Sequence, residues 1–156
     1  KTFGEDIKIL LFGVSMGGAA VLMLSGEKLP ENVKGIISDC AYTSALAVLD
    51  HQLKVQYGLP PFPIMHMTSL ITKLRAGYFL GAASALRQVK KAKLPILFIH
   101  GKEDRFVPFK MVYELYEACT SDKKLFVVEG ARHAESFIID NDGYRETAKE
   151  FIRSIL

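Results

Sequence analysis

The sequence predicts an α/β fold in which a parallel sheet is flanked by helices. Three observations predict it. Short apolar runs and helix-forming segments follow one another in turn along the chain. Within each run the apolar residues are nearly continuous and do not alternate with polar residues. Each run ends in glycine or a polar residue. Continuous apolar runs are typical of strands buried on both faces of a parallel sheet. The 156 residues are 49% hydrophobic and 24% charged, which is the balance of a globular domain.

The first elements lie close to the start of the chain. Residues 7–12, "IKILLF", predict a strand buried on both faces, and Gly13 ends it. Residues 17–26 are rich in Ala, Leu and Met and predict a helix that stops at a glycine. Residues 33–38, "VKGIIS", predict a second buried strand.

The middle of the chain has a different character. Residues 44–55 and 64–78 predict two helices, separated by "GLPPFP", whose three prolines interrupt any regular element. The segment is rich in Leu, Met, Tyr and Phe, and it contains no buried-strand pattern. We therefore expect a helical insertion at residues 42–88.

Regular alternation returns after the insertion. Residues 94–101 and 123–130 predict a third and a fourth strand, and residues 108–119 predict a helix that begins with proline. Residues 143–156 predict a closing amphipathic helix. The order of elements is thus strand, helix, strand, insertion, strand, helix, strand, helix.

The charge and cysteine content exclude several classes of protein. The net charge is +3 and the basic residues are scattered, which does not indicate a nucleic-acid surface. Cys40 and Cys119 fit neither metal-ligand spacing nor a disulfide framework, so both are interpreted as small core residues in a reducing compartment. No apolar run reaches the length of a membrane span. The localisation stays unassigned, with the cytoplasm as the starting assumption, because a signal or anchor upstream of Lys1 would change it.

Polar side chains follow the ends of the predicted strands. Ser15 follows the first strand, Asp39 the second, Asp104 the third and His133 the fourth. Functional groups of parallel α/β sheets gather at the carboxyl ends of the strands. A serine hydroxyl becomes a nucleophile when a histidine takes its proton, and a carboxylate orients that histidine. Ser15, His133 and Asp104 are therefore the candidate nucleophile, base and acid.

The glycines around Ser15 explain why a serine stands between a strand and a helix. The segment G-V-S-M-G fits a sharp turn at which small neighbours, Gly13 and Gly17, let strand and helix pack closely. The helix then begins at the serine, so its unpaired amides point at the site. The amide of Met16 is the candidate donor to an oxyanion.

Three motifs resemble the α/β-hydrolases over essentially the whole chain. "GVSMGG" resembles the turn that carries the nucleophile, "LFIHGKEDRFVP" places Asp104 at the acid position, and "VEGARHAES" places His133 at the base position. The closest resemblance is to the bacterial branch of serine aminopeptidase, lysophospholipase-like and acyltransferase-like hydrolases, which includes many esterases.

The resemblance implies a division of the chain. Residues 1–41 would form the nucleophile part of the hydrolase core, residues 42–88 a helical cap or lid, and residues 89–156 the part with the acid and histidine loops. The strands that precede the nucleophile in this family, and the loop with the second oxyanion donor, have no counterpart in the sequence. We therefore expect the C-terminal part of such an enzyme, completed by its N-terminal portion or by a second copy that covers the exposed sheet edge.

Several residues compete for the same roles. Glu103 could replace Asp104 as the acid, and Asp39 could do so in a rearranged site. His100 ends a buried strand and is interpreted as a structural hydrogen-bonding residue. His51 and His66 lie in the predicted cap, where packing or solvent-facing roles are expected.

The resulting hypothesis is a serine hydrolase that cleaves a small carboxylic ester through an acyl-enzyme, with no metal or organic cofactor. Tyr42, Phe62 and Met65 are candidates to bind an apolar acyl group from the cap. The alternatives are a peptidase, amidase or thioesterase with the same machinery, or a non-catalytic binding protein on a hydrolase fold. The absence of an acidic cluster that would hold a free amino terminus disfavours an aminopeptidase.

Overall fold

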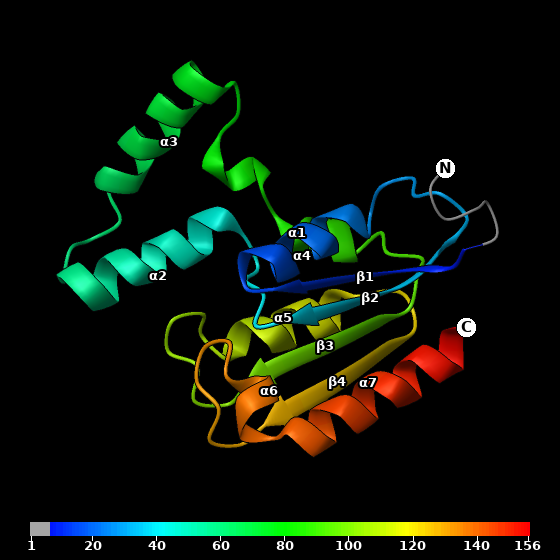
Figure 1. Ribbon diagram of the computed structural model, residues 1–156. Helices are drawn as coiled ribbons and strands as arrows, with labels where there is room; N and C mark the ends of the chain where they lie inside the picture. The colour runs from blue at the N-terminus through cyan, green and yellow to red at the C-terminus, as the bar shows by residue number, and fades with distance from the viewer. Residues whose placement is uncertain (1–6) are drawn as a thin grey trace.

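The computed structural model describes residues 7–156 and has one parallel sheet of four strands in the order β1-β2-β3-β4 (Figure 1). The strands are β1 (Ile9–Val14), β2 (Val33–Asp39), β3 (Ile96–Gly101) and β4 (Lys123–Val128). All three pairings are parallel. The predicted α/β fold class is confirmed, and the carboxyl ends of the strands share one edge of the sheet.

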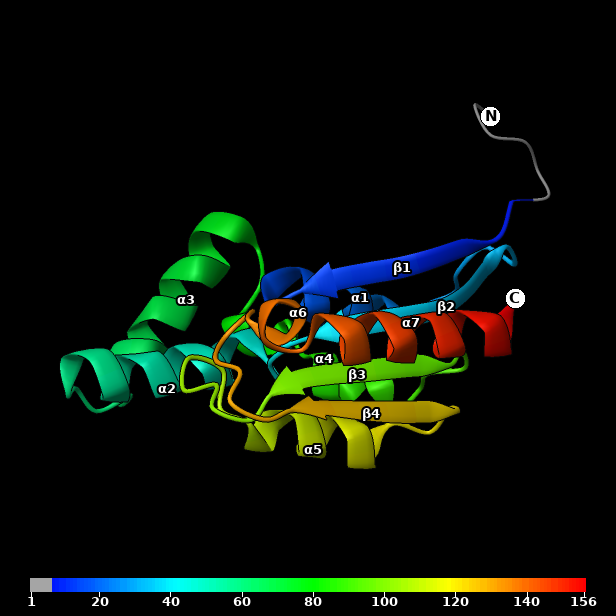
Figure 2. The same ribbon diagram turned by 60° about the horizontal axis from the view of Figure 1, so that its bottom comes forward.

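Helices cover both faces of the sheet (Figure 2). The helices α1 (Met16–Leu24), α4 (Ala85–Val89) and α5 (Lys110–Ala118) pack on one face. On the other face lie α7 (Asn141–Ile155) and, before it, the short helix α6 (Ser136–Ile139). The sheet with these five helices is called the body below.

The central strand β3 shows why the apolar runs are continuous. All six of its residues are buried. Ile96 and Phe98 belong to the core shared with α1, α4 and α5, whereas Leu97 and Ile99 belong to the core shared with α7. Because successive side chains point to opposite faces, a strand covered on both sides needs apolar residues at every position.

The first strand differs from its prediction. β1 begins at Ile9 and extends to Val14, two residues past the predicted end, and it is an edge strand of the described sheet. The Phe12 side chain is 54% exposed. The expectation of burial on both faces is therefore not met among residues 7–156. The start of the predicted segment 1–41, residues 1–6, lies outside the described residues.

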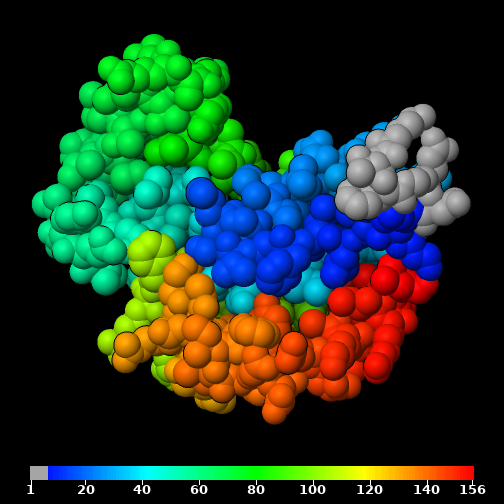
Figure 3. All heavy atoms as spheres, in the orientation of Figure 1, coloured from blue at the N-terminus to red at the C-terminus, as the bar shows by residue number. Residues whose placement is uncertain are grey.

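The insertion is helical, as predicted. It contains α2 (Ala45–Tyr57), α3 (Ile64–Ala76) and the 3-10 turn η1 (Leu80–Ala82), which together are called the cap. Figure 3 shows the cap as a lobe that stands out from the body. The next helix, α4, falls at the end of the predicted segment 42–88 but packs on α1 as part of the body. None of the helices within residues 7–156 is long and apolar enough to cross a membrane.

Candidate active site

Three side chains from three strand ends meet at the carboxyl edge of the sheet. Ser15 directly follows β1, Asp104 lies in the loop after β3, and His133 lies in the loop after β4. The Ser15 Oγ atom lies 2.8 Å from His133 Nε2, and His133 Nδ1 lies 2.8 Å from Asp104 Oδ2. With Nδ1–H donating to the carboxylate, Nε2 accepts the proton of the serine hydroxyl. The three residues singled out from the sequence thus form one hydrogen-bonded chain.

The backbone at Ser15 is strained. Its φ of 55° and ψ of −114° lie in a region that residues with a side chain rarely adopt. The Ser15 amide donates to the Asp39 carbonyl oxygen at 2.8 Å, which ties the turn to the end of β2. This turn ends β1 and starts α1 without an intervening loop, so the hydroxyl stands at the N-terminus of the helix.

Two glycines, Gly13 and Gly18, permit that turn, whereas the sequence predicts Gly13 and Gly17. A Cβ at Gly13 would lie 2.2 Å from the Gly17 carbonyl oxygen, and a Cβ at Gly18 would lie 2.7 Å from the Asp39 carbonyl oxygen. At Gly17, by contrast, a Cβ would meet no atom of residues 7–156 within 4 Å. Close packing of strand and helix therefore depends on Gly13 and Gly18 rather than on Gly17.

Asp104 is held as a buried carboxylate. Its Oδ1 atom accepts from the amides of Phe106 and Val107, both at 2.9 Å. Burial alone would raise the pKa of Asp104, but hydrogen bonds from His100, His133 and the Val107 amide outweigh that effect and lower it to about 2. The carboxylate is therefore charged at neutral pH. Glu103, the competing acid, is exposed and lines the same cavity as His133, whereas the carboxylate bonded to His133 Nδ1 is that of Asp104.

His100 lies against the Asp104 carboxylate. Its side chain is fully buried, and Nε2 lies 3.1 Å from the Val107 carbonyl oxygen and 3.4 Å from Asp104 Oδ2. Both neighbours are acceptors, so Nε2 carries the proton. The structure thus places His100 where the sequence put it, as a buried hydrogen-bonding residue, with Asp104 as its partner.

His133, the candidate base, lies at an open cavity. His133 lines a cavity of about 650 Å³, and the Phe106 ring packs on its imidazole with the ring centroids 4.8 Å apart. The rest of the lining is Glu103, Arg105, Gly130 and Arg132. Sequence reasoning did not single out Phe106, although its place two residues after the candidate acid was the available signal.

The cap contacts the site through the acid loop. His51 of α2 donates from Nε2 to the Arg105 carbonyl oxygen at 2.9 Å, and the Gln52 amide donates to the Phe106 carbonyl oxygen. These bonds fasten α2 to the loop that holds Asp104. The cap histidine His66 instead packs edge-to-face on Phe62, at 5.2 Å between ring centroids.

The second strand end serves the site differently. The Asp39 carboxylate is buried and accepts from Ser136 at 3.3 Å and from the Tyr144 hydroxyl. Burial raises the pKa of Asp39, and these bonds only partly offset it. The structure joins Asp39 to α6 and α7, and joins Asp104 to His133.

Cys40 lies beneath the hydrogen-bonded chain. Its Sγ atom and the ligand atoms of Asp104 and His133 lie within 4.8 Å of one another. Burial, together with the charge of Asp39, raises the pKa of the Cys40 thiol to about 12, which disfavours the thiolate that a metal needs. Asp104 and His133 are hydrogen-bonded to each other and belong to the chain with Ser15, so Cys40 is interpreted as a buried packing residue beside them. Cys119 is buried as well.

The candidate oxyanion donor lies beside the serine. Met16 is the first residue of α1, and the first four amides of a helix have no partner within it. Met16 itself is 72% exposed. The N-terminal end of the helix also favours a negative charge.

The three candidate acyl-binding residues are not gathered around His133. Tyr42 is half-buried and packs against the core of the body. Met65 is buried and lines a cavity of about 210 Å³ between α2 and α3, whereas Phe62 is exposed. None of the three lines the cavity that contains His133, and their role in binding an acyl group stays a prediction.

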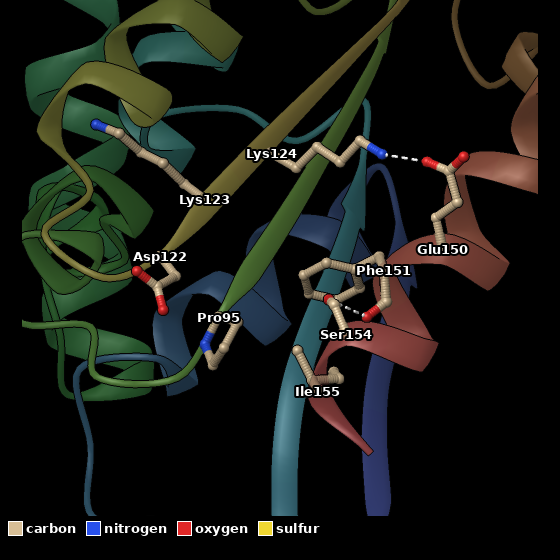
Figure 4. A pocket seen from close by; sticks show the side chains of 8 residues that line it. All are labelled: Pro95, Asp122, Lys123, Lys124, Glu150, Phe151, Ser154 and Ile155. Carbon is tan, nitrogen blue, oxygen red and sulfur yellow. Dashed lines mark hydrogen bonds and ion pairs between the residues drawn. The ribbon is translucent and has the colours of Figure 1, made fainter.

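A further cavity lies at the opposite edge of the sheet (Figure 4). It has a volume of about 460 Å³ and includes Pro95 and Asp122, which precede β3 and β4, together with residues of α7. Two of its charged groups are paired, with Lys124 Nζ 2.7 Å from Glu150 Oε2, and Lys123 Nζ donates to the carbonyl oxygens of Tyr116 and Cys119. This cavity lies at the amino ends of the strands, away from Ser15.

Comparison with known sequences finds hydrolase relatives. The family model described as serine aminopeptidase, S33, matches residues 63–137. The uncharacterized protein YqkD of Bacillus subtilis is 32% identical over 142 residues, which are 91% of this chain and 47% of that protein. The alpha/beta hydrolase domain-containing protein 17C of Xenopus tropicalis is 32% identical over 78 residues, which are 50% of this chain and 24% of that protein. The chain spans about half the length of YqkD.

Solved structures share the fold. An acylaminoacyl peptidase of Pyrococcus horikoshii matches with a TM-score of 0.70 and 17% identity, over 97% of this chain and 25% of that chain. The esterase Pf2001 of Pyrococcus furiosus matches with a TM-score of 0.70 and 19% identity, over 95% of this chain and 53% of that chain. At these identities the likeness concerns the fold.

Proposed function

The chain belongs to the α/β-hydrolase superfamily, and we propose that it acts as a serine hydrolase on carboxylic esters. One observation carries the proposal: the hydrogen-bonded chain from Ser15 through His133 to Asp104, with 2.8 Å at both junctions. The strained backbone at Ser15 supports it, because strain of that kind clusters at functional sites.

In the proposed reaction Ser15 attacks the ester carbonyl and His133 Nε2 takes the hydroxyl proton. Asp104 holds the imidazole in the tautomer with hydrogen on Nδ1 and stabilises the imidazolium that forms. The tetrahedral intermediate collapses as His133 returns the proton to the leaving alcohol, and the acyl group stays on Ser15. Water activated by His133 then releases the carboxylic acid.

The oxyanion needs two donors, of which the chain supplies one candidate. The Met16 amide at the N-terminus of α1 is that donor. We propose that the second donor comes from sequence that lies outside this chain in the complete protein. The length of the relatives, about twice that of the chain, supports this proposal.

Charge favours an ester over a peptide with a free amino terminus. An ammonium group needs a carboxylate near the scissile bond, and Glu103 in the His133 cavity is accompanied by Arg105 and Arg132. Asp50, the one acidic residue of segment 42–88, lines cavities at α2 and not the cavity of His133.

A fluorophosphonate probe tests the activated serine directly. Its phosphorus bonds to Ser15 Oγ as fluoride leaves, and mass spectrometry locates the adduct. We expect labelling at Ser15 that is lost in Ser15→Ala and in His133→Ala, and is retained in His66→Ala, a matched substitution in the cap. Labelling should be measured on this chain and on the longest natural form. Absence of labelling in both forms would refute the proposal.

The leaving group is tested by comparing substrates. We expect turnover of 4-nitrophenyl esters to exceed turnover of the corresponding anilides. A preference for anilides would replace the esterase with an amidase or peptidase while leaving the roles of Ser15 and His133 unchanged.

A further inference from the structure

The outer side of α3 carries an uncovered apolar stripe. Its members recur at helical spacing on one face and are between 45% and 78% exposed: Met67, Leu70, Ile71 and Leu74. The opposite face of the helix, with buried Met65 and half-buried Ser69, packs toward α2 and η1. The amphipathic helix therefore turns its apolar side away from the protein.

The stripe lies on the outermost element of the molecule. Figure 1 shows α3 as the helix farthest from the sheet, beyond α2. Exposed aromatic residues also precede and follow the helix in the chain, with Tyr57 and Phe62 before it and Tyr78 and Phe79 after it. An exposed apolar stripe of this kind marks an interaction site.

The charges on the helix that carries the stripe have a single sign. α3 contains Lys73 and Arg75 and no Asp or Glu, whereas Asp50, the one acidic residue of the cap helices, lines the cavity between α2 and α3 with buried Met65. At helical spacing Lys73 and Arg75 fall on opposite sides of the stripe. Lys73 Nζ donates to the Gly77 carbonyl oxygen at 2.7 Å and lies 5.7 Å from the centroid of the Phe79 ring, so its charge lies at the C-terminal end of α3. The partner must therefore be apolar in its interior and negatively charged at its surface.

We propose that the outer stripe of α3 docks on the surface of an anionic lipid bilayer. Apolar side chains would enter the boundary between headgroups and acyl chains, aromatic rings would lie at the headgroup level, and the flanking cations would meet the phosphates. A second copy of the chain is disfavoured, because a two-fold contact would bring like basic charges together. The proposal concerns binding alone and does not depend on the catalytic role of Ser15.

Insertion of the stripe into a bilayer can be measured by the fluorescence of one introduced tryptophan, because the chain contains no tryptophan of its own. Leu74→Trp places the probe in the stripe, and Leu24→Trp places a control on α1 of the body. We expect vesicles of 70% phosphatidylcholine and 30% phosphatidylglycerol to shift the emission of Leu74→Trp to the blue and to leave Leu24→Trp unchanged. An emission of Leu74→Trp that is blue-shifted without vesicles and unchanged by them would show that protein covers the stripe, and would overturn the proposal.

Loss of binding gives the complementary measurement. In vesicle co-sedimentation we expect Ile71→Asp with Leu74→Asp to weaken binding at least tenfold, and Lys73→Glu to weaken it severalfold and only at low salt. The control Leu24→Asp should bind like the unmodified chain. Circular dichroism checks that each variant keeps its helices. Equal binding of all variants, or equal binding to pure phosphatidylcholine vesicles, would overturn the proposal.

Discussion

The helices α5 and α3 show how differently the body and the cap use apolar residues. In α5 the residues Met111, Val112 and Leu115 lie within the protein core and are at most 5% exposed. In α3, among its apolar residues, only Met65 is buried, and the stripe on the other side is open. Apolar periodicity thus predicts a helix in both regions, but the neighbouring elements decide which side is covered.

The body and the cap also differ in what they contribute to the candidate active site. Every residue of the hydrogen-bonded chain comes from the body, on loops held by parallel strands. The cap contributes His51 and Gln52, which bind backbone carbonyls of the acid loop rather than side chains of the site. We infer that substitutions in the body change the reaction itself, whereas substitutions in the cap change access and binding.

The largest expected effect compares two carboxylates. Asp104→Asn should lower ester turnover by about 10⁴-fold, because an amide does not hold the imidazole in the productive tautomer or stabilise its charge. Asp50→Asn, the same change in the cap, should alter turnover by less than about tenfold, since Asp50 lies outside the His133 cavity. Steady-state kinetics on 4-nitrophenyl esters, with the longest natural form of the protein, decides. Comparable losses would mean that the cap takes part in the chemistry.

The next comparison concerns core packing. Leu115→Ala should lower the free energy of unfolding by about 3 kcal/mol, because the fully buried side chain leaves a cavity in the core. Leu74→Ala should change it by less than about 0.5 kcal/mol, since that side chain is 78% exposed. Urea unfolding followed by circular dichroism, at one protein concentration, measures both. A large loss for Leu74→Ala would show that the stripe is covered in solution.

The free energy of unfolding should depend on pH in the acid range through two buried carboxyls of the body, Asp104 and Asp39. The pKa of Asp104 is about 2 in the folded protein against 3.8 for an unperturbed carboxyl, so the unfolded state binds its proton first as the pH falls. The stabilisation is complete above about pH 4 and is lost as the pH falls toward 2; it amounts to about 2 kcal/mol. Asp39 acts oppositely, since its raised pKa makes the folded state bind the proton first.

Urea unfolding at several pH values tests this dependence. We expect Asp104→Asn to lose less stability than the unmodified chain between pH 4 and pH 2, by about 2 kcal/mol. Identical slopes for the unmodified chain and Asp104→Asn would assign the acid sensitivity to other carboxyls.

The sequence predicts the body well for a physical reason. Strands covered on both faces need an apolar residue at every position, so β3 can be predicted from its own residues alone. The turn at Ser15 is legible too, because the strained backbone and the close approach at Gly13 require small residues. Asp104 and His133 could be singled out because the carboxyl ends of parallel strands share one edge.

The remaining features depend on contacts that local pattern does not encode. The exposure of Phe12 depends on which strand lies beside β1, and an apolar run reads the same in the middle and at the edge of a sheet. The stacking of Phe106 on His133 joins two loops far apart in the chain. The role of Gly18 rather than Gly17 depends on the position of the Asp39 carbonyl oxygen at the end of β2.

A substitution of Phe12 should have the smallest effect on the free energy of unfolding. It also tests whether the edge strand β1 is an association surface. This side chain is on the same face of the sheet as Leu10, which packs against the α7 core, but no described element covers it. We propose that the edge of β1 pairs with the remainder of a longer chain or, in this chain by itself, with a second copy. Light scattering after gel filtration should then give a mass above 17.4 kDa that rises with concentration.

A charge on the edge strand should block that pairing. We expect Phe12→Lys to lower the apparent mass toward 17.4 kDa, because a lysine on an edge strand opposes the addition of another strand. The free energy of unfolding of the monomer should change by less than about 0.5 kcal/mol, as for other exposed positions. Ile138→Lys, at a more exposed apolar position of the body away from β1, should leave the mass unchanged. A monomer at every concentration before any substitution would contradict pairing at β1, and loss of association in Ile138→Lys but not in Phe12→Lys would move the contact to α6.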